Sequence, residues 1–368
     1  MKKINNLILL LFLLANSTLF SYVVYNPTLP SFNGQLWLTG YYVNQNLSDS
    51  SSIGLGYIPE ISSSYTIDDN SMIDFEYAHY IFKNYNTNTI SNKYRSWARY
   101  SNDNLDVRIG LQKIAFGTAF FLRPLAWFDS LDFTSTTGQT DGAEALRFIY
   151  SPSNALAMWL WVVDNDISGQ SYGGRMEISS IGLLEGDWGF TYHKDTESSQ
   201  HYLSPNQLSY NSILDRGGDD IIDLDEISNK NNRLGIDYRY DGDFGFWIEG
   251  CHYMMKEKLT FLTLGFDYTI PNFNGILLRY ETMFSRSSFQ SELFSVLSTN
   301  TYTAFHLDVP IDHINNLSLY SFSDWEEYTS DNLIRWSTTY DSFNIDYMLT
   351  LKPGKFNDIF QIMFIYNH

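Results

Sequence analysis

The residues of this sequence whose types and spacing could do chemistry are arginines in three neighbouring alternating segments. Arg95 and Arg99 stand four residues apart in the first segment, Arg108 lies in the second and Arg147 in the third. Residues at i, i+2 and i+4 of a strand share one face, so these guanidinium groups would line a common surface. A row of fixed cations selects solutes by charge and size. We interpret the row as a solute-selecting wall or, in the simpler alternative, as paired charges that keep a wide wall hydrated.

A second candidate site is an acidic stretch in the longest connection of the chain. Counted as a calcium-binding loop, its positions 1, 5, 9 and 12 are Asp215, Asp219, Asp223 and Glu226. Oxygen ligands at these positions suit Ca²⁺, but the sharp-turn position holds Asp220 instead of the usual glycine. We expect either a calcium-ordered outer loop or, more simply, an acidic surface loop that repels anions. No other cofactor is expected.

Two further patterns resemble catalytic motifs, but neither predicts an enzyme. Gly169, Ser171 and Gly173 fit Gly-x-Ser-x-Gly, a motif that needs a strand-to-helix turn, whereas this stretch lies between two alternating segments. His306 and Asp308 would share one face as an acid/base pair, yet no serine partner can be assigned. A hydrated wall histidine is the better interpretation, and we expect no enzyme activity.

The elements that position these residues are strands, because period-2 alternation dominates the sequence. In 232–240, 262–268 and 343–351, apolar residues alternate with polar, charged or glycine residues. One face could contact lipid while the other carries full charges, as the strands of a water-filled barrel require. A soluble β-sandwich would instead turn its apolar face inward. Acids on the charged face include Asp74, Glu76, Asp106, Glu177, Asp237, Glu249, Asp267, Glu281, Asp308 and Asp346.

The connections between these segments alternate between short and long. The short ones, such as 68–70, 102–104 and 152–154, have the composition of tight turns. Short periplasmic turns and long outer loops are typical of outer-membrane barrels. An additional strand at 57–67 makes the strand number even, so we predict an all-β, antiparallel up-and-down transmembrane barrel of about 18 strands, or about 16 in the alternative. The long connections lie near 44–56, 83–92, 113–142, 164–172, 195–231, 286–300, 325–331 and 352–357.

The N-terminus and the composition agree with export to a membrane. Two lysines precede an apolar block from Leu7 to Ala15, which is shorter than the roughly 20 residues of a membrane-spanning helix. We assign residues 1–21 to a signal peptide and 22–368 to the barrel. Aromatic residues make up 17% of the chain and charged residues only 18%, as expected of a barrel with an apolar outer face. The net charge of −19 argues against nucleic acid as a partner.

The connection 113–142 is too apolar for an ordinary surface loop. Because an apolar loop needs a surface to pack against, we predict that it folds into the barrel and constricts the pore opposite Arg108 and Arg147. In the alternative it covers the mouth of the barrel as a plug or partner surface. Its apolar residues are Ala119, Phe120, Phe121, Leu122, Leu125, Trp127 and Phe128, and its charges are Lys113, Arg123, Asp129 and Asp132.

The same region resembles porin-like bacterial outer-membrane proteins. These proteins carry a Gln-x-Ile-x-x-Gly core, a proline followed by an aspartate-rich turn, and a Gly-x-x-x-Leu strand. YIPEIS at 57–62 and MIDFEYA at 72–78 are similar to their early strands. The resemblance covers about a third of the chain and implies a porin-like barrel without identifying a solute. The matching residues are Gln112, Ile114, Gly117, Pro124, Phe128, Asp129, Asp132, Gly142 and Leu146.

These patterns together predict a porin in the outer membrane of a Gram-negative cell, allowing diffusion of small hydrophilic solutes. The arginines beside an inward loop favour anionic or sugar-like solutes. The competing interpretation is a non-channel, plugged barrel that acts as an adhesin or as a structural or binding protein. Expected partners are outer-membrane lipid and small solutes, and a homotrimer is compatible with the sequence.

Overall fold

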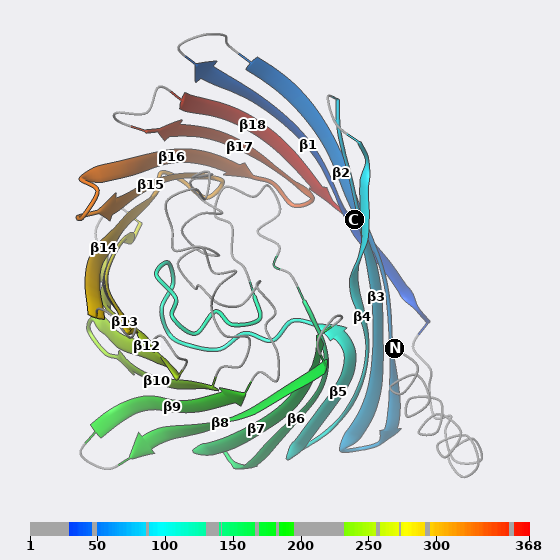
Figure 1. The fold of residues 1–368 in the computed structure, drawn as a ribbon. Helices are drawn as coiled ribbons and strands as arrows, with labels where there is room; N and C mark the ends of the chain where they lie inside the picture. Colours follow the sequence, from blue (N-terminus) through cyan, green and yellow to red (C-terminus); the bar gives the residue numbers. More distant parts are fainter. Residues whose placement is uncertain are drawn as a thin grey trace.

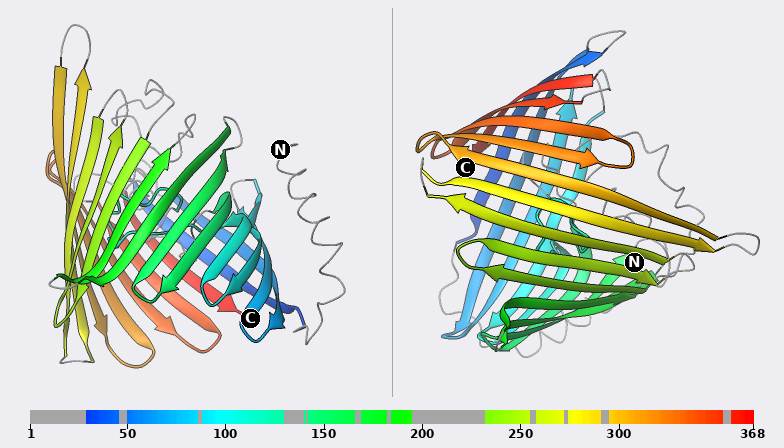
Figure 2. Two further views of the ribbon diagram at one scale, coloured as in Figure 1. Left: turned by 90° about the horizontal axis from the view of Figure 1, so that it is seen from below. Right: turned by 90° about the vertical axis from the view of Figure 1, so that its left-hand side faces the viewer.

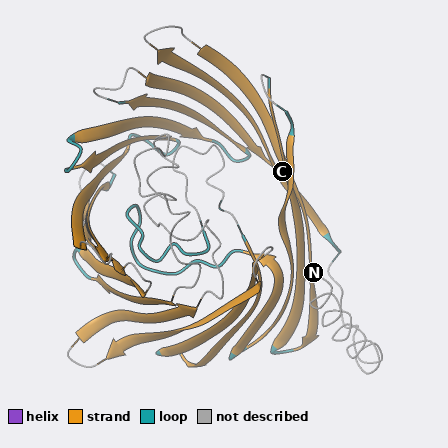
Figure 3. Ribbon diagram, viewed as in Figure 1, coloured by secondary structure: helices purple, strands orange, loops and turns teal. Residues whose placement is uncertain are grey.

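The computed structural model describes residues 29–45, 50–85, 88–129, 140, 142–165, 169–181, 184–194, 232–254, 258–271, 274–290, 295–352 and 357–368. Within these ranges the regular structure is all strand (Figure 3), and no helix there is long and apolar enough to cross a membrane. Three predicted features lie outside the described residues: the signal peptide at 1–21, the constriction residue Asp132 and the calcium loop at 215–226. All three assignments remain predictions.

The strands follow the order of the chain. The first nine are β1 (Ser31–Gln45), β2 (Ser50–Asp68), β3 (Ser71–Asn84), β4 (Ile90–Asn102), β5 (Leu105–Gln112), β6 (Ala143–Ser153), β7 (Leu156–Asn165), β8 (Gly169–Ile181) and β9 (Leu184–Lys194). The others are β10 (Asn232–Asp241), β11 (Gly245–Met254), β12 (Lys258–Ile270), β13 (Ile276–Gln290), β14 (Ser295–Pro310), β15 (Asn315–Asp324), β16 (Thr329–Thr339), β17 (Phe343–Leu351) and β18 (Asn357–Asn367).

These strands form one closed antiparallel barrel. Each strand pairs with its neighbours in the chain, and β1 pairs with β18 to close the sheet at 18 strands. The ring and its tilted strands are seen in Figures 1 and 2. The prediction of 18 strands is confirmed, and the additional strand predicted at 57–67 lies within β2.

We call the end of the barrel that carries the long connections the loop end and the opposite end, with the short connections, the turn end. Several strands extend further toward the loop end than the sequence predicted. The connection expected near 44–56 has narrower bounds, because β1 continues to Gln45 and β2 begins at Ser50. Likewise β13 continues to Gln290 and β14 begins at Ser295, within the loop expected at 286–300. Backbone hydrogen bonds of a ladder do not depend on side-chain polarity, so polar stretches rich in Ser and Thr continue the pairing beyond the apolar belt.

The outer surface of the barrel is a belt of exposed apolar side chains. Leu38, Leu55, Leu160, Phe284 and Phe364 are 43–63% exposed, and they alternate with buried neighbours that face the lumen. An apolar outer face around a polar interior inverts the pattern of a soluble protein and suits a bilayer. The alternation in the sequence therefore distinguishes the residues that face outward from those that face the lumen.

Three inward-facing tryptophans lie over glycines directly opposite them on the next strand. A Cβ on any of these glycines would overlap the indole ring, so glycine is required for the ring to lie flat against the wall. Two of these indole N–H groups then find acceptors, His193 Nδ1 for Trp161 and Glu281 Oε1 for Trp247. The register pairs are Trp37 with Gly56, Trp161 with Gly173, and Trp247 with Gly265.

His368 completes the seam between the first and last strands. Its backbone exchanges two hydrogen bonds of 3.0 Å with Gly34. Its ring nitrogen Nε2 lies 3.1 Å from the Tyr57 hydroxyl, and the ring packs beside Phe32 and Tyr366. His368 thus contributes an aromatic side chain to the outer face at the turn end.

Candidate functional site

The described part of the long connection, residues 113–129, lies inside the ring of strands (Figure 1). It follows Gln112, the last residue of β5, whose side-chain amide donates to the carbonyl oxygen of Ala145 at 2.9 Å. The segment then crosses the lumen to β11 and β13, where its backbone is hydrogen-bonded. It therefore connects two separate parts of the inner wall.

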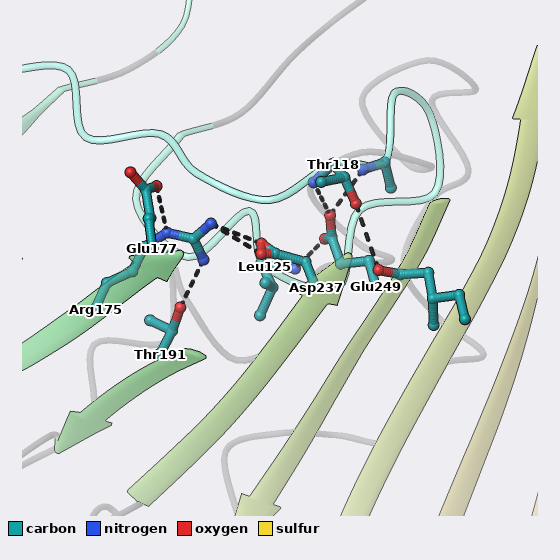
Figure 4. Close-up of polar contacts among 9 residues, drawn as sticks. Thr118, Leu125, Arg175, Glu177, Thr191, Asp237 and Glu249 are labelled. Carbon is teal, nitrogen blue, oxygen red and sulfur yellow. Dashed lines mark hydrogen bonds and ion pairs between the residues drawn. The ribbon is translucent and has the colours of Figure 1, made fainter. Parts of the chain in front are cut away.

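Glu249 of β11 accepts three backbone N–H groups from this segment. Thr118 and Ala119 donate to Oε2 at 2.7 and 2.8 Å, and Leu125 donates to Oε1 at 2.7 Å (Figure 4). Gly117 permits this approach, because its φ is +96° and a Cβ there would lie 2.5 Å from the carboxylate. Glu249 is only 1% exposed, so loop backbone takes the place of water around its charge.

Glu281 of β13 holds the next three residues of the loop. Its Oε1 accepts from the Phe120 N–H at 2.6 Å, and its Oε2 accepts from Phe121 and Leu122 at 2.9 and 2.7 Å. The indole of Trp247 also donates to Oε1, at 3.1 Å. We call Glu249 and Glu281 the carboxylate anchors, because together they bind six backbone N–H groups of the loop.

Apolar packing covers the wall side of the same segment. Phe116 stacks on Trp161 with ring centroids 5.5 Å apart, and Phe121 meets Phe322 edge to face at 5.9 Å. The loop side chains and the wall form one hydrophobic cluster. This explains why 113–129 is too apolar for a surface loop. Its loop members are Ile114, Phe116, Phe121, Leu122, Leu125, Trp127 and Phe128.

A buried ionic cluster lies on the wall beside the anchors. Arg175 of β8 binds both oxygens of Asp237 through Nη2 at 2.7 and 2.8 Å, and it also donates to Glu177 and Thr191 (Figure 4). Gly189 of β9 stands opposite Glu177 and Asp237 in the register, and a Cβ there would collide with the Arg175–Asp237 pair. The cluster is fully paired, which suits a structural role for Arg175.

The arginines predicted to form a row do lie side by side on β4, β5 and β6. Arg99 is the register partner of Arg108, which is the partner of Arg147. Two acids neutralise part of this charge. Asp74 lies 2.6 Å from Arg99, and Asp106 lies 3.6 Å from Arg99 and 3.5 Å from Arg147. We call these three arginines the arginine row.

Arg108 differs from its two neighbours. Its guanidinium carbon lies 4.2 Å from the centre of the Trp97 ring, and no acid of the described chain forms an ion pair with it. Arg147 similarly lies over Trp159, at 5.4 Å. Arg99 and Arg147 thus hold the ion pairs of the row, whereas Arg108 interacts with Asp106 and with Glu76 of β3 only beyond ion-pair distance.

The other residues predicted at the constriction lie in different surroundings. Arg95 is buried and donates to the carbonyl oxygen of Thr140 at 2.7 Å. Arg123 pairs with Asp129 at 3.2 Å within the loop. Lys113 is exposed, and its carbonyl oxygen accepts a 3.4 Å bond from Arg147. Among the described residues, the charged side chains of the loop form no ion pair with the arginine row. The contact between them is this hydrogen bond to the Lys113 backbone.

The two patterns that resembled catalytic motifs are wall residues. Ser171 lies within β8, between Gly169 and Gly173 of the same strand. His306 stacks on Tyr320 at 4.3 Å, and its Nε2 lies 3.9 Å from Asp308. No group of three or more His, Cys, Asp or Glu residues in the described ranges could hold a metal ion.

No protein-family model matches this sequence, and no curated protein matches it. Solved structures do match. The Pseudomonas aeruginosa channel OccK2 (OpdF) aligns with a TM-score of 0.58 and 9% identity over 92% of this chain and 97% of its own. Vibrio cholerae OmpT, an outer membrane protein in trimer form, gives 0.54 and 9% over 94% and 100%. Salmonella typhi OmpF gives 0.51 and 9% over 93% and 100%.

At this level of identity the likeness concerns the fold. The shared feature is the closed antiparallel barrel, and it involves the whole fold, since nearly all of each chain aligns. The exposed apolar belt found on this chain is the surface that such a barrel presents to lipid. The chain therefore folds as a porin-like outer-membrane β-barrel.

Proposed function

We propose that this protein is an outer-membrane channel through which small hydrophilic solutes diffuse, narrowed by residues 113–142. The observation that carries the proposal is the attachment of the loop. The carboxylate anchors hold 113–129 against β11 and β13, whereas the arginine row lies on β4 to β6. A segment bonded to one side of a lumen narrows the cross-section within the barrel, which favours a constriction over a cover on its mouth.

The arginine row supports a preference for anionic solutes within this proposal. Arg108 has no ion-pair partner in the described chain, and Arg99 and Arg147 share Asp106. A cation without an ion-pair partner on a pore wall attracts anions and raises their local concentration. Guanidinium groups also bind carboxylate and phosphate oxygens in a fixed geometry. Sugar-like solutes that carry an acidic group would satisfy both features.

Reconstitution into planar lipid bilayers tests the channel. We expect stepwise current increases as single barrels insert, and a zero-current potential in a KCl gradient that indicates anion preference. A barrel that is folded, as judged by its heat-modifiable mobility on gels, but carries no current would contradict the channel. That result would favour the plugged adhesin or binding barrel instead.

The proposal includes export by a signal peptide at 1–21 and assembly as a homotrimer. The support for assembly is limited to the fold, since the structure of Vibrio cholerae OmpT that aligns with this chain is a trimer form. Light scattering of the detergent-purified protein is expected to give three times the mass of one processed chain. A mass of one chain would contradict the trimer and leave the channel proposal intact.

The calcium loop remains a separate proposal. If Asp215, Asp219, Asp223 and Glu226 bind Ca²⁺, calorimetric titration of the purified barrel is expected to show binding at millimolar or lower concentration, the range of extracellular calcium sites. Replacing Asp215 and Glu226 with Asn and Gln should abolish the heat. Absence of binding by the unmodified protein at millimolar Ca²⁺ would exclude the site.

A further inference from the structure

A row of polar side chains crosses the outer surface of β11 to β14 near the loop end. His252, Thr260, Arg286 and Thr299 are successive register partners on these four strands. They alternate with buried inward residues such as Cys251 and Phe261, so they face outward. His252 Nδ1 lies 2.8 Å from Thr260 Oγ1. We call this set the outer polar row.

On β12 and β13 the next outward residues toward the turn end are apolar. Leu262 lies two residues after Thr260 and Phe284 two residues before Arg286, and they are 39% and 45% exposed. On these two strands the outer polar row therefore begins where the lipid-facing belt stops. An arginine at this level must sit among lipid headgroups, because a charge in the hydrocarbon region is costly.

Arg286 is exposed and has no acidic partner in the described chain. By strand alternation, no acid of the described residues faces outward on β9 to β14. The outward acids Glu144, Asp164 and Asp358 belong to β6, β7 and β18. Among the described residues, Arg286 thus lies in a sector of the outer surface that offers it no counter-charge.

The other outward cations lie in the loop-end half of the barrel too. Lys83, Lys93 and Lys194 are exposed on β3, β4 and β9. The remaining arginines of the described strands face the lumen, and the turn end presents exposed aromatic side chains such as Tyr268 and Tyr366. On the described strands, the outward positive charge therefore lies at the level of one leaflet.

We propose that the outer polar row, centred on Arg286, binds the phosphate group of a glycolipid in the outer leaflet. The inference rests on the outer-membrane placement in the proposed function, which puts the long loops outside. A phosphate monoester carries nearly two negative charges and three acceptor oxygens. Arg286 supplies the cation, while the hydroxyls of Thr260 and Thr299 and the His252 ring can hydrogen-bond sugar hydroxyls and phosphate oxygens.

A phosphorylated glycolipid fits this row better than a zwitterionic phospholipid. The phosphate of phosphatidylethanolamine is a diester whose charge is balanced by its own ammonium group, so it gains less from Arg286. Each basic residue near an anionic membrane surface contributes about 1 kcal/mol of attraction. The polar flanks at Thr260 and Thr299 add hydrogen bonds that a sugar headgroup can use.

Lipid binding to the purified barrel tests this inference by native mass spectrometry. The three probes are diphosphoryl lipid A, the same lipid with its phosphates removed, and phosphatidylethanolamine. We expect diphosphoryl lipid A to be retained preferentially. Arg286→Ala should weaken its binding about fivefold, which is the value of one surface cation, and Arg286→Lys should retain most of it. Thr301→Ala, one outward row nearer the belt, is the matched control.

Equal retention of phosphorylated and dephosphorylated lipid A by the unmodified protein would overturn the inference. An Arg286→Ala barrel that folds and binds diphosphoryl lipid A as before would also overturn it. The comparison of lipids uses the native protein, so it remains decisive if a variant fails to fold. No measurement here depends on current, so failure of lipid binding and failure of the channel are distinguishable.

Discussion

Replacing Glu281 with glutamine is expected to release the loop from the barrel wall. Each oxygen of the Glu281 carboxylate accepts two N–H groups, from Phe120 and Trp247 on one side and from Phe121 and Leu122 on the other. A glutamine amide has one oxygen, so its NH₂ group faces two donors whichever way it is turned. Two orphaned donors at about 1–2 kcal/mol each weaken docking by a factor of about 30 to 700.

Glu249→Gln is expected to have a smaller effect on the same loop. One oxygen of Glu249 accepts two N–H groups, but the other accepts only that of Leu125. The amide can therefore turn its NH₂ toward Leu125 and leave a single donor without an acceptor. Both carboxylates are almost fully buried, so burial does not distinguish them. We therefore expect Glu281→Gln to release the loop to a greater extent than Glu249→Gln.

Amide hydrogen exchange measures this release without reference to transport. Peptides covering 118–125 should exchange slowly in the native barrel and much faster in Glu281→Gln. Asp346→Asn is the control, because Asp346 is equally buried but pairs with Arg335 at 2.5 Å, away from the loop. Unchanged exchange in Glu281→Gln would contradict the anchor role. If the barrel conducts, its open-channel conductance should rise in parallel.

The barrel could be predicted from the sequence because its two signals are local. Alternation specifies which residues face outward, and turns such as 68–70 and 102–104 separate strands that pair with their neighbours. The loop-end bounds could not be predicted in the same way. Ser50 to Ser52 read as a loop by composition, yet they continue β2 because the adjacent β1 offers a ladder. Strand pairing beyond the lipid-facing belt leaves no hydrophobic pattern in the sequence.

The anchors were placed on the inner face from the sequence, but their role was not assigned. A weak signal exists in the register. Asp74 and Asp267 stand directly opposite Arg99 and Arg279, whereas Glu281 stands opposite Gly265 and Ala304. An inward acid with no cation directly opposite it on either neighbouring strand needs another partner. Which segment supplies it depends on how the loop crosses the lumen, and local patterns do not encode that path.

The prediction that the loop charges face the arginine row remains untested. The structure does identify a competing partner for two of them, because Arg123 and Asp129 neutralise each other within the loop. Spacing alone could not reveal this pairing, since it depends on the turn around Pro124. The arginine row itself was predictable, because its members occupy equivalent positions on three successive strands.

Replacing Arg108 with glutamate is expected to shift the selectivity of the channel from anions toward cations. Arg108 lies between Arg99 and Arg147 and has no ion pair in the described chain, so its loss leaves no acid unpaired. The change alters the wall by two charges. A Coulomb energy of about 1 kcal/mol for two charges 4 Å apart in water means that reversing the wall charge costs a nearby anion about 2 kcal/mol, so we expect the anion-to-cation permeability ratio to change by more than about tenfold.

The zero-current potential in a KCl gradient measures this ratio, and two comparisons identify its cause. Arg108→Lys keeps the charge and should keep the selectivity, although it loses the planar contact with Trp97. Raising the salt from about 0.1 M to 1 M shortens the screening length from about 10 to 3 Å, so the difference between Arg108→Glu and native protein should shrink.

Arg147→Glu should shift selectivity in the same direction but also destabilise the wall, because it places a second carboxylate beside Asp106. Unchanged selectivity in Arg108→Glu at low salt would exclude the arginine row from the narrowest part of the path, whatever the position of the loop.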